Sequence, residues 1–218
     1  TDSLTVGGGP ESLSILELLL KGGPIFMLAL LIMSIAAIYI FIERFVKIRD
    51  AAKIDNDFME QIQQHMLKGN IKGALNLCDE INTPIARMVR KGIRRIGKPL
   101  RSIEVAIENE GKIQLLELEN NLATLATIAG AAPMIGFLGT VTGMITAFYQ
   151  IASAGNNVDP GMLAGGIYQA LVTTAAGLSI GIIAFIAYNL LVSMVEKVVY
   201  KMETHTVEFI DFLQEPAK

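Results

Sequence analysis

Three long stretches of this chain contain neither a charged side chain nor a histidine. They cover residues 22–42, 120–158 and 160–195, which is 21, 39 and 36 residues. A helix needs about 20 consecutive, mostly apolar residues to cross the hydrocarbon core of a bilayer. We therefore predict three transmembrane helices, at residues 25–45, 121–151 and 164–195. Glu43 and Arg44 end the first one, where we expect their long polar side chains to reach the membrane surface.

The sequence before the first span predicts a short helix on the membrane surface. Ser14 and Glu17 stand three apart, as in a capping box at a helix start. An apolar stripe at helical spacing follows, as in helices that lie in the interface. It consists of Leu13, Leu16, Leu19 and Leu20. Residues 1–24 therefore form an N-terminal segment that contains an interfacial helix.

Basic residues are concentrated between the first and second spans. Residues 46–119 hold 13 of the 18 Lys and Arg residues, whereas residues 152–163, between the second and third spans, hold none. Positively charged loops stay on the cytoplasmic side of a membrane. The pattern places residues 46–120 and 196–218 in the cytoplasm, and the N-terminus and residues 152–163 on the opposite side. The basic residues of 87–101 either bind acidic membrane lipids or serve only to set this orientation.

Helix and turn signals divide the cytoplasmic region 46–120. We predict one helix over residues 54–68 and a second over residues 71–80. A third begins at Thr83–Pro84, which has the N-cap and first-position proline typical of a helix start. Glycine and proline in residues 97–99 end this third helix.

The second and third spans are predicted to continue far into the cytoplasm. No proline occurs between Ser102 and Pro133, which predicts one helix over residues 102–151, about 75 Å long at 1.5 Å per residue. The third span continues into an amphipathic C-terminal helix over residues 196–218. The predicted fold is an all-α membrane protein with three transmembrane helices.

Composition excludes several functions. Hydrophobic residues make up 52% of the chain and charged residues 18%, and a net charge of -3 gives no basic surface for nucleic acid. The single cysteine, Cys78, excludes an internal disulfide. The sequence shows neither a metal-binding cluster nor a catalytic constellation, so we predict no cofactor and no enzymatic activity.

Small residues recur in the second and third spans at three- and four-residue spacing. Such spacing lets helix backbones approach closely in lipid. It fits helix packing within one chain, and it also fits contacts between copies, because three spans form only a thin bundle. The glycines assigned to these contacts are Gly136, Gly139, Gly143, Gly177 and Gly181.

Polar side chains lie among these glycines. One interpretation is that the threonine hydroxyls hydrogen-bond to carbonyls of their own helix, which is common and functionally silent. Gln169 is different, because a primary amide that faces lipid is costly, so we expect it to face protein or water. Gln169 and Thr173 are four residues apart and share one helical face.

The second and third spans contain no acidic or basic side chain. Proteins that move ions by protonation usually place Asp, Glu or His within the membrane. If this chain moves protons, a partner protein must supply the carboxylate. The alternative is a membrane scaffold that conducts nothing.

Two motifs in these spans resemble those of a known family. Residues 133–143 have the sequence PMIGFLGTVTG, and residues 166–177 have GIYQALVTTAAG, followed by Tyr188–Asn189. They are similar to the motifs of the MotA/TolQ/ExbB proton-channel family, as is Glu43–Phe45 at the end of the first span. The resemblance covers about residues 13–195. Three spans with an external N-terminus resemble ExbB most, and TolQ, rather than the four-span MotA.

The resemblance implies a motor subunit of the bacterial inner membrane, with residues 1–24 and 152–163 in the periplasm. It implies a homopentamer around the spans of two ExbD-like subunits, each of which supplies a membrane aspartate. The proton motive force then energises a TonB-like protein and, through it, outer-membrane transport. Thr140 and Thr174 match the family's lumen-facing threonines, and Pro133 matches its second-span proline. The predicted ion pathway comprises Thr140, Gln169, Thr173 and Thr174.

Gln169 departs from the family pattern, in which glutamate is common at this position. Because an amide does not titrate, a proton relay through this side chain is excluded. In one account the partner's aspartate carries H⁺ while Gln169 orients it or a water molecule. In the other, Na⁺ is bound by neutral oxygen donors, which suit hard cations, from Thr142, Gln169, Thr173 and Thr174. We expect H⁺, with a Na⁺-driven, TolQ-like or gliding-type motor and a non-conducting scaffold as alternatives.

Overall fold

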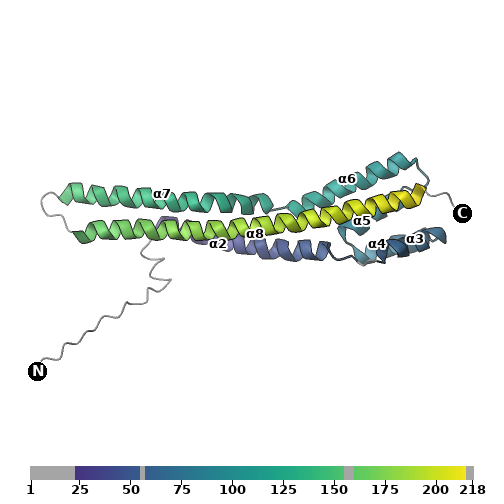
Figure 1. Cartoon of the computed structure of the whole chain (residues 1–218), viewed down its shortest axis with the longest axis horizontal. Coiled ribbons are helices and arrows are strands. Elements are labelled where there is room, and N and C mark those ends of the chain that lie inside the picture. Colours follow the sequence, from purple (N-terminus) through teal and green to yellow (C-terminus); the bar gives the residue numbers. More distant parts are fainter. Residues whose placement is uncertain (1–22, 55–56, 155–159, 215–218) are drawn as a thin grey trace, which may run out of the picture. The chain divides into compact units, whose positions relative to one another are not determined.

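The computed structural model describes residues 23–54, 57–154 and 160–214, and these residues are almost entirely helical (Figure 1). They form the helices α2 (Pro24–Ala51), α3 (Phe58–Leu67), α4 (Ile71–Ile81), α5 (Pro84–Ile93), α6 (Leu100–Glu119), α7 (Leu122–Ala154) and α8 (Pro160–Gln214). Within these ranges the chain has no β-strand. The predicted interfacial helix at residues 13–20 lies outside the described residues, as does the centre of the connection 152–163.

Among the described residues, three helical segments are long and apolar enough to cross a membrane: Pro24–Ala51, Leu100–Ser153 and Leu163–Gln214. This confirms the prediction of an all-α protein with three spans. Helix α8 has 55 residues and is therefore about 80 Å long, well beyond the roughly 30 Å of a bilayer core. The chain is a multi-pass membrane protein.

The structure corrects the prediction of one continuous helix over residues 102–151. Helix α6 ends at Glu119 and helix α7 begins at Leu122. Between them Asn121 has a φ of 62°. Asparagine is one of the few residues that adopt this left-handed conformation readily, because its short polar side chain hydrogen-bonds locally. Pro133, by contrast, lies inside α7 without ending it, as prolines in membrane helices often do.

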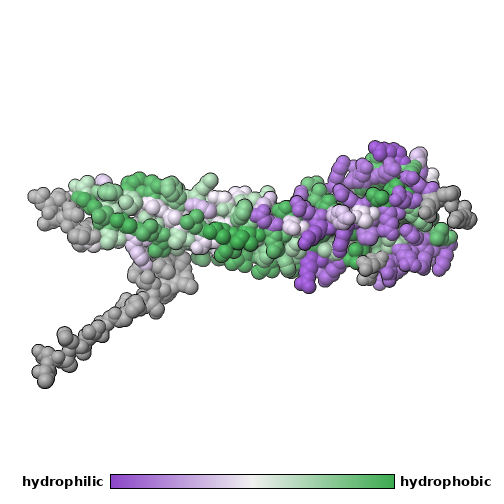
Figure 2. Space-filling view, in the orientation of Figure 1, coloured by the Kyte–Doolittle hydropathy of each residue, from purple (hydrophilic) through white to green (hydrophobic). Residues whose placement is uncertain are grey.

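The helices pack into two compact units. Unit 1 contains the described residues through Ala37 together with Thr127–Phe185, and unit 2 contains Ile38–Ala126 together with the described residues from Ile186 onward. Helices α2, α7 and α8 contribute to both units. On the face shown in Figure 2, hydrophilic side chains cover much of α3–α6 in unit 2, whereas the surface of unit 1 is mainly apolar.

The core of unit 1 joins its first helix to the other two. Met27 and Leu30 of α2 are buried together with Ala132 of α7. Partly buried neighbours complete this cluster: Met33, Ile135, Ala176 and Ile180. Most other large side chains of the unit, such as Ile32 and Phe185, are exposed in the single chain, as expected for surfaces that face lipid or other proteins.

Unit 2 has a core like that of a water-soluble domain. Helix α5 packs against α4 and α6, and α3 packs against α4. Phe209 of α8 is fully buried, and a Cβ added to Gly92 of α5 would lie 2.7 Å from its ring. The Phe209 ring therefore packs directly against the backbone of α5, and such close packing is typical of protein interiors.

The predicted start of the third cytoplasmic helix is confirmed. The Thr83 hydroxyl accepts a hydrogen bond from the Ala86 N–H at 3.4 Å, and Pro84 is the first residue of α5. The preceding Asn82 has a φ of 47°, which turns the chain between α4 and α5. Thr83 thus satisfies one of the N–H groups that every helix start leaves without a partner.

Candidate functional site

Helices α7 and α8 approach each other closely at the predicted glycines of unit 1. A Cβ added to Gly136 would lie 3.1 Å from Gly177 Cα, and one added to Gly177 would lie 2.6 Å from the Ala132 carbonyl oxygen. Two turns further along α7, a Cβ on Gly143 would lie 3.2 Å from Ala170 Cβ. At Gly136 and Gly177 only a residue without a side chain permits this separation, because the atoms that a Cβ would meet there are backbone atoms.

The two remaining glycines of the set contact side chains of the opposite helix. A Cβ on Gly181 of α8 would overlap the Pro133 ring, and a Cβ on Gly139 of α7 would overlap the Thr173 methyl group. Pro133 therefore fills a space that Gly181 leaves open. The helix contact extends over the predicted motif of both spans.

Two threonine hydroxyls meet within this contact. Thr140 Oγ1 of α7 and Thr174 Oγ1 of α8 are hydrogen-bonded to each other. The Thr174 hydroxyl also donates to the Gly136 carbonyl at 3.0 Å, and the Thr140 hydroxyl lies 3.3 Å from the Ala170 carbonyl. Both threonines are half-buried. The result is an oxygen-rich but uncharged centre, because the described residues of unit 1 include no Asp, Glu, Lys, Arg or His.

The other two residues of the predicted ion pathway are placed differently. Thr173 is 1% exposed, and its hydroxyl donates to the Gln169 backbone carbonyl at 2.8 Å. The Gln169 side chain lies beside Gly23, with Nε2 3.0 Å from the position that a Cβ on Gly23 would take. It lines a cavity of about 410 Å³. Thr140 and Thr174 are thus bonded to each other across the helices, and the roles of all four residues remain predictions.

Several hydroxyls of unit 1 bond back to their own helix. Thr142 donates to the Leu138 carbonyl at 3.0 Å, Thr146 donates to the Thr142 carbonyl at 2.9 Å, and Ser179 donates to the Ala175 carbonyl at 2.8 Å. Thr142 and Thr146 thus make the predicted bonds to their own helix, and Ser179 does the same. A back-bonded hydroxyl has no proton left to donate, but its oxygen still accepts hydrogen bonds.

Unit 2 contains a buried polar cluster that the sequence did not reveal. Arg44 is 3% exposed. Its Nη1 donates to the Glu117 backbone carbonyl at 3.2 Å, and its Nη2 donates to Glu43 Oε1 at 2.9 Å. This corrects the prediction that Arg44 reaches the membrane surface. The last carbonyls of a helix lack partners within that helix, and Arg44 supplies one at the end of α6.

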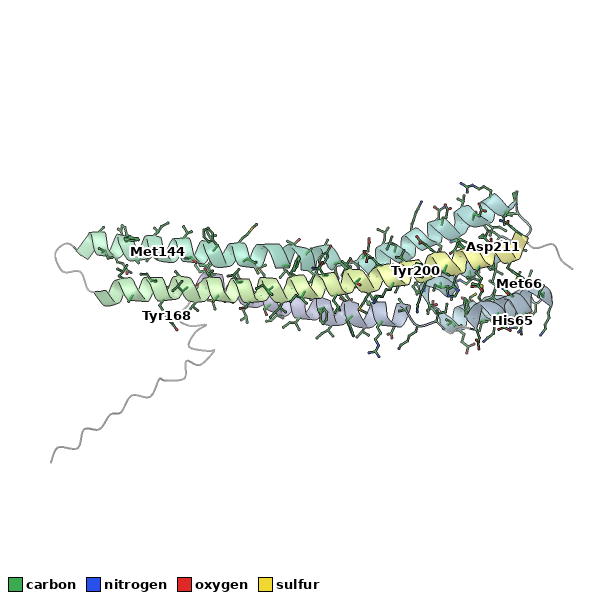
Figure 3. The ribbon with its side chains drawn as sticks, in the orientation of Figure 1. His65, Met66, Met144, Tyr168, Tyr200 and Asp211 are labelled. Atoms are coloured by element: carbon green, nitrogen blue, oxygen red, sulfur yellow. The ribbon has the colours of Figure 1, made fainter. Side chains whose placement is uncertain are left out.

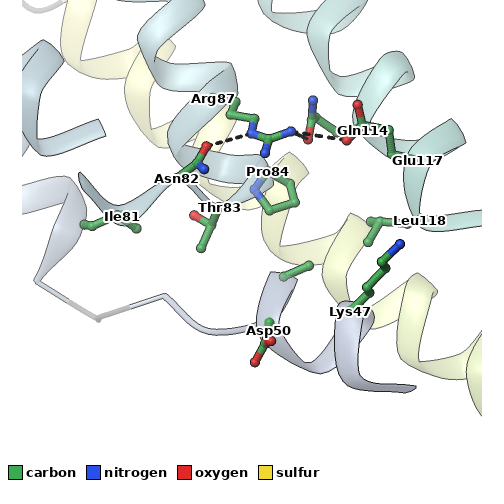
Figure 4. Close-up of a pocket in the computed structure, with 11 residues that line it drawn as sticks. Lys47, Asp50, Ile81, Asn82, Thr83, Pro84, Arg87, Gln114, Glu117 and Leu118 are labelled. Carbon is green, nitrogen blue, oxygen red and sulfur yellow. Dashed lines mark hydrogen bonds and ion pairs between the residues drawn. The ribbon is translucent and has the colours of Figure 1, made fainter. Parts of the chain in front are cut away.

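Arg87 continues this cluster at another cavity, which lies in unit 2 (Figure 4). Its Nε donates to Asn82 Oδ1 at 3.0 Å, and its Nη1 donates to Gln114 Oε1 at 3.3 Å and to Glu117 Oε2 at 3.2 Å. The cavity has a volume of about 400 Å³, and Lys47 and Asp50 also line it. Two cations and two carboxylates therefore face this space, which gives it no net charge to attract an ionic ligand.

The described residues contain neither a metal-binding cluster nor a reactive cysteine. Within the part of the chain that the structure describes, no group of three or more His, Cys, Asp or Glu could hold a metal ion, and His65 and Asp211 lie on separate helices (Figure 3). Cys78 is 1% exposed. Burial, aided by the neighbouring Asp79 carboxylate, raises the pKa of the Cys78 thiol to about 12, so it is a poor nucleophile at neutral pH.

The three long apolar helical segments among the described residues define the class of this chain as a multi-pass helical membrane protein. A family model agrees with this class. The model of the MotA/TolQ/ExbB proton channel family matches residues 80–204. The chain belongs to this family.

Relatives with two different names match the chain. It is 32% identical over 195 residues to a biopolymer transport protein ExbB homolog of Methanothermobacter thermautotrophicus, a match that covers 87% of this chain and 67% of that protein. It is 26% identical over 189 residues to the biopolymer transport protein ExbB of Neisseria meningitidis, covering 78% and 84%. It is 39% identical over 90 residues to the Tol-Pal system protein TolQ of Haemophilus influenzae, covering 41% and 37%. Several other relatives are matched over only about two fifths of their length.

Proposed function

We propose that this chain is an ExbB-like subunit of an inner-membrane motor that uses the proton motive force to energise TonB-dependent outer-membrane transport. Five copies form a ring around the single spans of two ExbD-like subunits. The N-terminus faces the periplasm and the C-terminus faces the cytoplasm. A TonB-like protein receives the mechanical work.

The hydroxyl pair of Thr140 and Thr174 is the observation that carries this proposal. It provides hydrogen-bonding oxygens inside an apolar helix contact, yet the described residues of unit 1 supply no carboxylate. Proton transfer through such a site requires a titratable group from another protein. The membrane aspartate of an ExbD-like subunit is a group of this kind, and the hydroxyls would hydrogen-bond to it or to its water.

Two related functions have support of their own. The match to TolQ favours a motor of the Tol-Pal type, which has the same membrane chemistry and a different receiving protein. Neutral oxygens of Gln169 and the threonines would also suit Na⁺, so a Na⁺-driven motor is the second candidate. The non-conducting scaffold is the alternative in which none of these oxygens has a role.

Native mass spectrometry of the chain, expressed with and without an adjacent single-span protein, tests the assembly. The expected result is a pentamer that retains two partner copies. A monomer or dimer that ignores the partner would contradict the motor.

The Thr174→Val variant tests the hydroxyl pair, because valine keeps the shape of threonine and removes its oxygen. We expect partner-dependent transport to fall about tenfold, equivalent to about 1.4 kcal/mol, while the assembly stays intact. The matched control is Ser179→Ala, which removes an exposed, back-bonded hydroxyl from the same helix and should leave transport unchanged. Full transport in both variants would favour the scaffold, and dependence on Na⁺ rather than on pH would favour the Na⁺ motor.

A further inference from the structure

The cavity beside Gln169 is a second polar feature of unit 1, and it involves neither Thr140 nor Thr174. It measures about 410 Å³ and lies between the start of α2 and the facing ends of α7 and α8. Four side chains with hydrogen-bonding oxygens line it: Thr142, Thr146, Gln150 and Gln169. The rest of its wall is glycine, alanine and apolar residues.

The wall of this cavity is rich in hydrogen-bond acceptors. The hydroxyl protons of Thr142 and Thr146 are used in bonds to their own helix, so each oxygen presents only lone pairs to the cavity. The amide groups of Gln150 and Gln169 add two carbonyl oxygens, together with N–H groups that donate to water. The four side-chain oxygens suit small cations, because carbonyl and hydroxyl oxygens are ligands of hard cations.

Lipid offers no hydrogen bonds to these four polar side chains, whereas water does. Unpaired polar groups in an apolar medium cost several kcal/mol each, and the volume would hold on the order of ten water molecules at about 30 Å³ each. Thr146 and Gln150 are exposed in the single chain, so the cavity is open on their side. Gln150 and Gly161 also place it near the ends of α7 and α8 that the connection 155–159 joins.

We infer that this cavity is a water-filled vestibule, formed within one subunit, that takes up small hydrated cations and leads them to Gln169. The proposed topology places the opening of this vestibule on the periplasmic side, and this one point rests on the proposed function. It requires neither a pentamer nor a transport function. It assigns Gln169 a position at the inner wall of an aqueous space, which explains how an amide is accommodated in a membrane span.

Cysteine accessibility in spheroplasts tests this inference, because the native chain itself should react little with a thiol reagent. Its only native cysteine is buried, with a thiol pKa of about 12. Thr146→Cys and Gln150→Cys introduce thiols into the cavity wall, and Ile145→Cys places one on an outward-facing apolar position of the same helix, 63% exposed. Thiolates form in water and react there, whereas a thiol in lipid stays protonated.

We expect a membrane-impermeant cationic methanethiosulfonate, added outside spheroplasts, to modify the Thr146→Cys and Gln150→Cys variants at least about tenfold faster than the Ile145→Cys variant. An anionic methanethiosulfonate should modify the two cavity variants about tenfold more slowly than the cationic one does. Both rates are first normalised to the rate at Ser153→Cys, at the exposed end of α7. Two cavity variants keep the test valid if one of them fails to assemble.

Equal rates at the cavity positions and at Ile145→Cys would overturn the vestibule. Equal rates for the two reagents would overturn its preference for cations. Modification only in inside-out vesicles would support a hydrated cavity and contradict the topology. Fast modification in a chain that forms no complex with a single-span partner would retain the vestibule while contradicting the proposed motor, so the two failures are distinguishable.

Discussion

The two units of this chain hold their helices together in opposite ways. In unit 1, α7 and α8 meet through glycine backbones and a hydroxyl pair, and the described residues carry no charge. In unit 2, a buried arginine, ion pairs such as Arg87–Glu117, and large apolar side chains connect the helices. The surroundings explain the difference. Lipid removes the hydrophobic advantage of packing two helices together, so close backbone contact has to replace it, whereas water favours a core.

Cys78 gives the largest expected effect, and it tests whether unit 2 excludes water. Because burial raises the pKa of its thiol from 9.0 to about 12, the folded chain at pH 8 should hold about a thousandfold less thiolate than the unfolded chain. We expect an alkylating reagent to modify Cys78 only after unfolding, as measured by mass spectrometry. Rapid alkylation of the native protein would contradict a closed core.

The same thiol makes the stability of unit 2 depend on pH. Above pH 9 the unfolded chain loses the Cys78 proton while the folded chain keeps it until about pH 12. The contribution is therefore fully present below pH 9 and is lost between about pH 9 and 12. A Cys78→Ala variant, which lacks the group, should lose less stability over that interval.

Arg44 gives the next largest effect, and it tests whether buried polar contacts hold unit 2. Arg44→Met keeps the apolar stem and leaves the Glu117 carbonyl without its side-chain donor, whereas Glu43 Oε1 keeps Lys47 Nζ at 2.7 Å. Loss of a buried hydrogen bond from a charged group costs up to about 3 kcal/mol. We expect the free energy of opening of unit 2, measured by the rate of Cys78 alkylation, to fall by that amount.

The matched control is Arg101→Met. Arg101 pairs with Glu104 at 3.2 Å, but its side chain is 77% exposed, and such pairs contribute less than about 1 kcal/mol. Similar losses in the two variants would show that the burial of Arg44 has no energetic consequence.

The contrast between the units also explains what could be predicted from the sequence. The charge-free stretches predicted the three spans, and Thr83–Pro84 predicted a helix start, because each signal lies in one continuous piece of sequence. The burial of Arg44 depends on a partner 73 positions away, and the sequence contained no sign of it. The break at Asn121 is a single residue in the left-handed region, which asparagine permits without requiring.

The candidate site shows the same limit. The motifs indicated Thr140 in the second span and Gln169 and Thr174 in the third as one set, without showing which of them meet. Only the packing of α7 on α8 brings the two hydroxyls into contact across 34 positions, while the Gln169 side chain lies by Gly23, which directly precedes the third helix, α2. Helical spacing assigns residues to a face of one helix, and it does not identify the helix that the face meets.

Gly177 gives the smallest of the three effects, and it tests whether backbone contact holds unit 1. In Gly177→Ala, the new Cβ would stand 2.6 Å from the Ala132 carbonyl oxygen and 2.8 Å from Gly136 Cα. Because both are backbone atoms, the helices themselves must separate, and overpacking of this kind costs about 2 kcal/mol. The thermal stability of the purified protein should fall.

In Gly130→Ala, on α7 of the same unit, the added Cβ meets nothing within 4 Å, so stability should be unchanged or slightly higher, since alanine favours helix more than glycine. Equal behaviour of the two variants would mean that unit 1 is not held by the close approach of α7 and α8, and the contrast with unit 2 would then have to come from lipid or from neighbouring subunits.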